Sequence, residues 1–277
     1  MSFLSIEILL VGKYNFTMPG TSRQKNPRGV EIVFTESNHR YSSIINGKEL
    51  VYVSGTKFIH PFFPPFDPDG TILKKSAEKK GMKPEDLKKE WEKAGRDSCI
   101  FGTKVHETIE DKLLGNEFRQ RPQDNREIQT FKAAISIAEK IQRVCNVKGI
   151  EQIVFDERLR IAGTIDLLAE SKDGKETWII DHKTNKVIEF ENKWNKFALD
   201  PISHLPDLNS THYGLQLSLY EYLLKSAGYI PRDRPVRRFV NHVSLDSAKF
   251  YELPDYSTEI RDMIIFTLMK NSQVQGL

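Results

Sequence analysis

The chain lacks several features that would place it outside the cell, in a membrane or among ATP-driven motors. Its two cysteines, Cys99 and Cys145, form no C-x-x-C pair, which predicts two reduced thiols and excludes a zinc or iron–sulfur framework. No apolar run approaches the ~20 residues that span a bilayer. The opening MSFLSIEILLVG has neither the basic start nor the cleavage site of a signal peptide. No G-x-x-x-x-G-K-[ST] motif occurs, so we expect no ATP site in this chain.

A strong excess of either charge is also missing. Lys and Arg number 41 against 38 Asp and Glu, a net charge of +3, which permits a nucleic-acid partner without indicating one. The 277 residues are 39% hydrophobic and 29% charged, as in ordinary soluble globular proteins. This length suits one elaborated domain or two small ones, with a sizeable core.

The N-terminal part divides by composition. We expect residues 1–30, which are polar and contain Pro and Gly from residue 13 onward, to be a weakly ordered lead-in. Alternating apolar and polar residues then predict a hairpin that turns at Asn46-Gly47. A Pro-rich loop and Lys-rich helices follow, with Pro84 starting a fresh helix. Residues 31–97 therefore read as an N-terminal hairpin and helical extension.

The remaining residues, 98–277, predict one α/β domain. Helices and strands alternate there in an order that favours a mixed central β-sheet flanked by helices. The predicted helices cover residues 97–115, 124–146, 211–228 and 257–270, and the predicted strands cover 151–157, 159–170 and 176–183, with a further strand pair in VRRFVNHVSLD and KFYELP.

Two strands of this domain carry charges that are costly to bury unless paired or metal-bound. Asp173-Gly174 is a favoured turn pair, and a two- or four-residue loop there pairs positions that sum to 347. Asp166 then faces Asp181, with Cβ atoms about 4.5–5.5 Å apart. Lys183 lies on the same face as Asp181, whereas the His182 side chain points away and only its backbone carbonyl could reach a metal.

Two facing carboxylates repel unless a positive charge lies between them. One interpretation is a divalent metal site, since oxygen donors on neighbouring strands suit Mg²⁺ or Mn²⁺. The other is a salt-bridge cluster in which Lys183 neutralises one aspartate. The hairpin alone does not decide between them.

The segment GTID, followed after 14 residues by DHKT, resembles the core signature of the PD-(D/E)XK nuclease superfamily. Position 165 is Ile in place of Pro, and the second acid is Asp in place of Glu. The flanks resemble the RecB-like exonuclease group: Gly102 and His106 match its Gly-x-x-x-His helix, and Gln216 and Tyr220 match its Gln-x-x-x-Tyr helix. The N-terminal hairpin and basic helices resemble the lead-in of some phage and mitochondrial members of that group. The resemblance covers roughly residues 98–253. Two cysteines cannot supply the four that hold an iron–sulfur cluster in some relatives.

The resemblance implies a restriction-endonuclease-like fold and a site that hydrolyses phosphodiester bonds. Catalysis would fall to Asp166, Asp181 and Lys183. The metal, Mg²⁺ or Mn²⁺, would be held by His106 with both aspartates, and by the His182 carbonyl. Nucleic-acid contacts are predicted for Gln216, Tyr220 and Lys186. Weaker candidates are Glu110 and Glu151 (or Glu157) for metal and Arg237 for phosphate; each could equally be an ordinary solvated charge.

The function so implied is metal-dependent exonuclease action on DNA ends, in DNA repair, replication or recombination. A structure-specific or restriction-type endonuclease on the same core is the first alternative, and a non-catalytic nucleic-acid binding protein is the second. We expect DNA ends, single- or double-stranded, as partner, with separate helicase or replication proteins as further partners and no membrane. The expected location is the cytoplasm of a bacterial or phage-infected cell, or an organelle.

Overall fold

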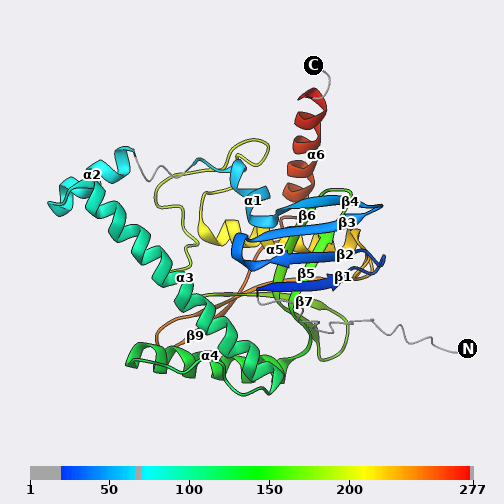
Figure 1. Cartoon of the computed structure of the whole chain (residues 1–277), viewed down its shortest axis with the longest axis horizontal. Coiled ribbons are helices and arrows are strands. Elements are labelled where there is room, and N and C mark those ends of the chain that lie inside the picture. Colours follow the sequence, from blue (N-terminus) through cyan, green and yellow to red (C-terminus); the bar gives the residue numbers. More distant parts are fainter. Residues whose placement is uncertain (1–19, 66–69, 275–277) are drawn as a thin grey trace, which may run out of the picture.

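The structure is a computed structural model that describes residues 20–65 and 70–274. Within these residues nine strands form one mixed sheet in the order β1-β2-β3-β4-β6-β7-β8-β9, with β5 on the other edge of β6. Helices lie on both sides of this sheet (Figure 1). The predicted class, a mixed central sheet flanked by helices in a restriction-endonuclease-like arrangement, is confirmed.

The elements lie close to where the sequence predicted them. The strands are β1 (Thr21–Lys25), β2 (Glu31–Thr35), β3 (Arg40–Ile45), β4 (Lys48–Ser54), β5 (Cys145–Asp156), β6 (Ile161–Ser171), β7 (Thr177–Lys183), β8 (Val236–Val243) and β9 (Ala248–Glu252), and the helices are α1 (Gly55–Ile59), α2 (Thr71–Lys80), α3 (Pro84–Leu114), α4 (Asn125–Val144), α5 (Asn209–Ser226) and α6 (Ser257–Val274).

The N-terminal strands form an antiparallel meander that joins the central sheet through a short parallel pairing of β4 with β6. The predicted hairpin turn is confirmed, since Ile45 pairs with Lys48 across Asn46-Gly47. The weakly ordered lead-in was wrong for residues 21–25, which form β1. Asn26 makes this possible because its buried side-chain oxygen accepts from the backbone N–H groups of Arg28 and Val30 and so holds a tight turn. Residues 1–19 lie outside the described part.

Two apolar layers hold the central sheet. On one side, α3 and α4 bury residues such as Val105 and Ile137 against β5 to β8. On the other side, α1, α5 and α6 bury residues such as Leu215 and Ile260. A helix that packs one stripe on a sheet needs a repeat near 3.6 residues, and Val105, Ile109 and Leu113 of α3 follow such a spacing.

The long helix α3 departs from prediction. A helix start was expected at Asp97 or Ser98, yet α3 runs unbroken from Pro84 to Leu114. Residues 85–98 contain good helix formers and no proline. The helix that begins at Pro84 therefore continues through Asp97 and Ser98, and neither residue caps a new helix. The predicted end at Gly115 is confirmed by its left-handed backbone, φ 71°. The first half of α3 and α2 project from the sheet, while the second half reaches it (Figure 1).

Among residues 20–65 and 70–274, no helix is long and apolar enough to span a bilayer.

Candidate metal centre

The site begins at Asp166, where the β6–β7 ladder stops. Leu167 pairs with Ile180 and Glu170 with Thr177, so the predicted register, with positions summing to 347, is confirmed. The loop is the four-residue alternative, because Ser171 N–H donates to the Glu176 carbonyl. At Asp166, the next position along β6, a side-chain hydrogen bond replaces the backbone pairing with β7. The His182 N–H donates to Asp166 Oδ2 at 2.7 Å.

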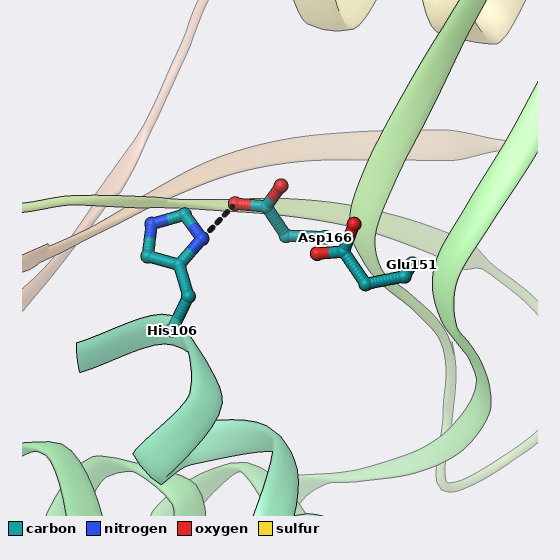
Figure 2. Close-up of side chains that lie close together, drawn as sticks. All are labelled: His106, Glu151 and Asp166. Atoms are coloured by element: carbon teal, nitrogen blue, oxygen red, sulfur yellow. Dashed lines mark ion pairs between the residues drawn. The ribbon is translucent and has the colours of Figure 1, made fainter. Parts of the chain in front are cut away.

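His106 reaches the same place from α3. Its Nε2 lies 2.9 Å from the His182 carbonyl oxygen, which can only accept, so Nε2 carries a proton, and in the neutral ring Nδ1 keeps a free lone pair. That Nδ1 lies 3.6 Å from Asp166 Oδ2 (Figure 2). A metal-binding histidine ordinarily donates its second ring N–H to a carbonyl or carboxylate. The His182 carbonyl therefore orients His106 in this arrangement, and its predicted role as a metal ligand stays a prediction.

Gly102 lets α3 come this close. A Cβ built on Gly102 would lie 3.3 Å from Thr184 Oγ1, just beyond the end of β7. Glycine one turn before His106 therefore places the helix against the strand that carries Asp181 and Lys183. This gives a physical reason for the Gly-x-x-x-His spacing.

Glu151 completes the cluster, although from the sequence it was only a weak candidate for metal binding. Ile150 pairs with Leu167 and Gln152 with Ile165, so Glu151 lies opposite Asp166. One ligand atom each of His106, Glu151 and Asp166 lie within 4.8 Å of one another, and Figure 2 shows the three side chains converging. Glu151 has φ 49°, a left-handed conformation that costs a non-glycine residue roughly 1–2 kcal/mol. No sequence pattern signals such a kink inside a strand.

The electrostatics of Glu151 reflect its neighbours. Removal from water, reinforced by the negative charges of Asp166 and Glu110, holds the pKa of Glu151 well above its usual range. A carboxyl group in this position is destabilised when it ionises without a counterion.

Asp181 and Lys183 form the second half of the site. Burial raises the pKa of Asp181, helped by Asp166, and the Lys183 ammonium only partly offsets this. Burial alone would lower the pKa of Lys183, but Asp181 and Asp166 outweigh it and raise that pKa. Lys183 contacts Asp181 Oδ2 as an ion pair, yet this buried oxygen has no well-aligned hydrogen bond from any described residue.

The donor set fits a divalent cation. Three carboxyl groups, those of Glu151, Asp166 and Asp181, share one nearby ammonium group, so ionising all three leaves an excess of negative charge. Two ligands of one Mg²⁺ at about 2.1 Å lie about 3–4 Å apart, and the 3.6 Å between His106 Nδ1 and Asp166 Oδ2 falls in that range. Carboxylate oxygens with one imidazole suit Mg²⁺ or Mn²⁺. A plain salt-bridge cluster leaves this excess charge without a partner.

The Gln-x-x-x-Tyr pair lies in α5 with little exposure. Gln216 Nε2 donates to the Tyr220 hydroxyl at 2.9 Å, and Tyr220 is 4% exposed. Its ring packs directly against Gly163 of β6: a Cβ on Gly163 would lie 2.2 Å from Tyr220 Cε1. Here Tyr220 packs inside the core, and its predicted contact with nucleic acid stays a prediction.

The other predicted residues lie around or away from this centre. Glu110 is 2.7 Å from Arg119, which also binds Asp111. Lys186 is exposed just after β7. Arg237 pairs with Glu252 at 2.6 Å beside Trp178, five positions from Lys183 along the sheet. At ~3.3 Å per residue this is about 16 Å from the site, so Arg237 is not brought to it. Glu157 binds Arg28.

Comparison with known proteins identifies the family of this chain. The family model of the PD-(D/E)XK nuclease superfamily matches residues 72–264, well over half of the chain. The chain belongs to the PD-(D/E)XK nuclease superfamily. The matched range runs from α2 into α6 and contains His106, Glu151, Asp166, Asp181 and Lys183.

Other comparisons add little. No curated protein matches significantly. Several solved chains match, one of them titled "Crystal structure of SSO0001", at 16% identity with a TM-score of 0.23, over 58% of this chain and 84% of that chain.

Membership of the superfamily makes the chain a nuclease-type hydrolase, and such nucleases generally use divalent metal ions.

Proposed function

We propose that the protein is a DNA exonuclease of the RecB-like group that requires Mg²⁺ or Mn²⁺ and hydrolyses phosphodiester bonds from DNA ends. The observation that carries the proposal is the convergence of His106, Glu151 and Asp166 beside the Asp181–Lys183 pair, in a chain of this superfamily. The RecB-like assignment rests on the Gly102–His106 and Gln216–Tyr220 patterns.

Each side chain has a distinct task in this proposal. His106, through Nδ1, and the carboxylates of Glu151, Asp166 and Asp181 would hold the ion. A bound Mg²⁺ or Mn²⁺ would polarise the scissile phosphate and lower the pKa of water. Lys183 is held as an ammonium by its carboxylate neighbours, which favours orienting the attacking water and offsetting charge on the phosphate over accepting a proton. Lys186 would contact the DNA backbone without reading its sequence.

Substrate topology separates exonuclease from endonuclease. End-labelled linear DNA, single- and double-stranded, and covalently closed circles of both kinds are incubated with Mn²⁺ or Mg²⁺. Degradation of the linear molecules with intact circles supports the proposal. Cutting of circles would favour the endonuclease alternative, and binding without cleavage of any DNA would favour the non-catalytic alternative.

Two variants control this assay. Asp181→Ala should abolish cleavage while leaving DNA binding, because it removes a predicted metal ligand from a site that remains folded. Asp246→Ala changes an exposed carboxylate in the β8–β9 turn and should cleave like the wild type. Undiminished cleavage by Asp181→Ala would point to a contaminating nuclease and against the assigned site, and equal loss in both variants would point to a nonspecific effect and likewise against it.

A further inference from the structure

The backbone around Glu151 needs a partner that the sheet does not provide. β5 pairs with β6 on one edge, and no other strand of residues 20–65 and 70–274 supplies partners for the Glu151 carbonyl and the Ile153 N–H on the other edge. Buried backbone groups of this kind are ordinarily hydrogen-bonded. At Glu151 the need is greater, because the left-handed backbone there is strained and persists only where its surroundings fix it.

Gln24 of β1 supplies that partner from a segment 127 residues away in sequence. Its side-chain Nε2 donates to the Glu151 carbonyl oxygen at 2.8 Å. Its Oε1 accepts from the Ile153 N–H at 2.9 Å and from Gln152 Nε2 at 2.6 Å. In a strand the C=O of one residue and the N–H of the second residue after it point to the same edge. The Gln24 amide therefore takes the place of a neighbouring strand's peptide group.

β1 lies beside β5 in the fold (Figure 1), although the sequence placed these residues in a lead-in. β1 is itself anchored by its full antiparallel pairing with β2. The kinked residue that Gln24 holds is the one whose carboxylate lies with His106 and Asp166. A link thus runs from the first described strand to the metal centre.

We propose that Gln24 is a positioning residue of the metal centre: its amide fixes the backbone of residues 151–153 so that the Glu151 carboxylate faces Asp166. The N-terminal strand thereby forms part of the site and is more than an accessory extension. This inference rests on the proposed function, because it requires Glu151 to bind the ion.

The test is the affinity for Mn²⁺ alone, measured without DNA by the loss of the free-ion electron paramagnetic resonance signal. Gln24→Met keeps the length of the side chain and removes both polar atoms. We expect about tenfold weaker Mn²⁺ binding, the lower range for loss of a group that orients a ligand. Arg23→Met is the matched control, since Arg23 is on the same strand and pairs with exposed Glu31. It should bind Mn²⁺ like the wild type.

A purely structural role is distinguished by a double-mutant cycle with Glu151→Ala. If Gln24 acts through Glu151, adding Gln24→Met to Glu151→Ala leaves the Mn²⁺ affinity unchanged, whereas independent effects add. Should Gln24→Met fail to fold, Gln24→Asn, with a shorter amide, takes its place in the cycle. Wild-type affinity in the Gln24 variant, or additive losses, would overturn the inference. Absence of Mn²⁺ binding by the wild type would instead overturn the proposed function.

Discussion

Replacing Gly163 by alanine is expected to destabilise the protein by about 1–3 kcal/mol, the usual cost of overpacking a core. The added Cβ would lie 2.2 Å from Tyr220 Cε1 and 2.8 Å from both Cζ and the hydroxyl oxygen, well inside contact distance. The Tyr220 ring has little room to withdraw, because it is 4% exposed and a Cβ on Gly55 would lie 3.0 Å from the same Cε1 atom.

Urea unfolding followed by circular dichroism measures this cost. A loss of 2 kcal/mol lowers the melting temperature by about 4–8 °C in a domain of roughly this size. Gly95→Ala is the control: Gly95 lies in α3 with open space around it, and alanine there should stabilise the helix by up to about 1 kcal/mol.

The steric origin has its own test. Tyr220→Leu removes the ring atoms that clash, so the double variant Gly163→Ala/Tyr220→Leu should be destabilised by less than the sum of the two single changes, by roughly 1 kcal/mol or more. Wild-type stability of Gly163→Ala, or costs that add, would refute the packing argument and the buried position of Tyr220.

Three further predictions concern charge and reactivity. Glu151→Gln should raise the melting temperature in EDTA at pH 8 and remove the stabilisation by Mn²⁺. Because the pKa of Glu151 is raised in the folded protein, this carboxyl group contributes favourably to folding stability below its unfolded pKa, and the contribution is lost as pH rises through its folded pKa. A lower melting temperature of the variant in EDTA would contradict this prediction. Burial opposes ionisation of Asp156, but hydrogen bonds from Arg158 lower the pKa of Asp156 to about 2. Asp156→Asn should therefore lose about 2 kcal/mol of stability in urea unfolding at pH 7, and the stability difference from wild type should shrink as pH falls from about 4 toward 2. A stability difference that does not depend on pH would exclude this electrostatic origin. Iodoacetamide should modify exposed Cys99 in the native protein and spare Cys145, which is buried and whose thiol pKa burial raises to about 11; labelling of both before denaturation would contradict the packing of α4 on β5.

Local sequence patterns predicted many of the helices and strands. The turn pair Asp173-Gly174 gave the register of β6 and β7, because an even-length loop leaves only one set of facing positions. The predicted bounds of α4 and α5 lie within a few residues of the observed ones. These predictions depended on chemistry within a few residues along the chain.

The parts that sequence reasoning missed depend on contacts between distant segments. β1 was read as lead-in because its place in the sheet depends on its pairing with β2 and on the contacts of Gln24 with β5, which the local composition does not display. Glu151 ranked low because its left-handed kink requires Gln24 from the other end of the chain. Gln216 and Tyr220 were predicted to contact nucleic acid, and no pattern near them in the chain indicates that the Tyr220 ring packs against Gly163 and Gly55.

The most direct test of the metal centre is the rate at which Asp166→Asn degrades end-labelled linear DNA, compared with wild type and with Asp246→Asn, in Mn²⁺ and in EDTA. Asp166 touches the His182 N–H and faces both His106 and Glu151, so its carboxylate is central to every contact proposed for the ion. We predict cleavage by wild type and Asp246→Asn in Mn²⁺ only, and a loss of at least about a hundredfold in Asp166→Asn, since metal catalysis contributes several kcal/mol. Cleavage in EDTA, or an undiminished rate in Asp166→Asn, would contradict the account.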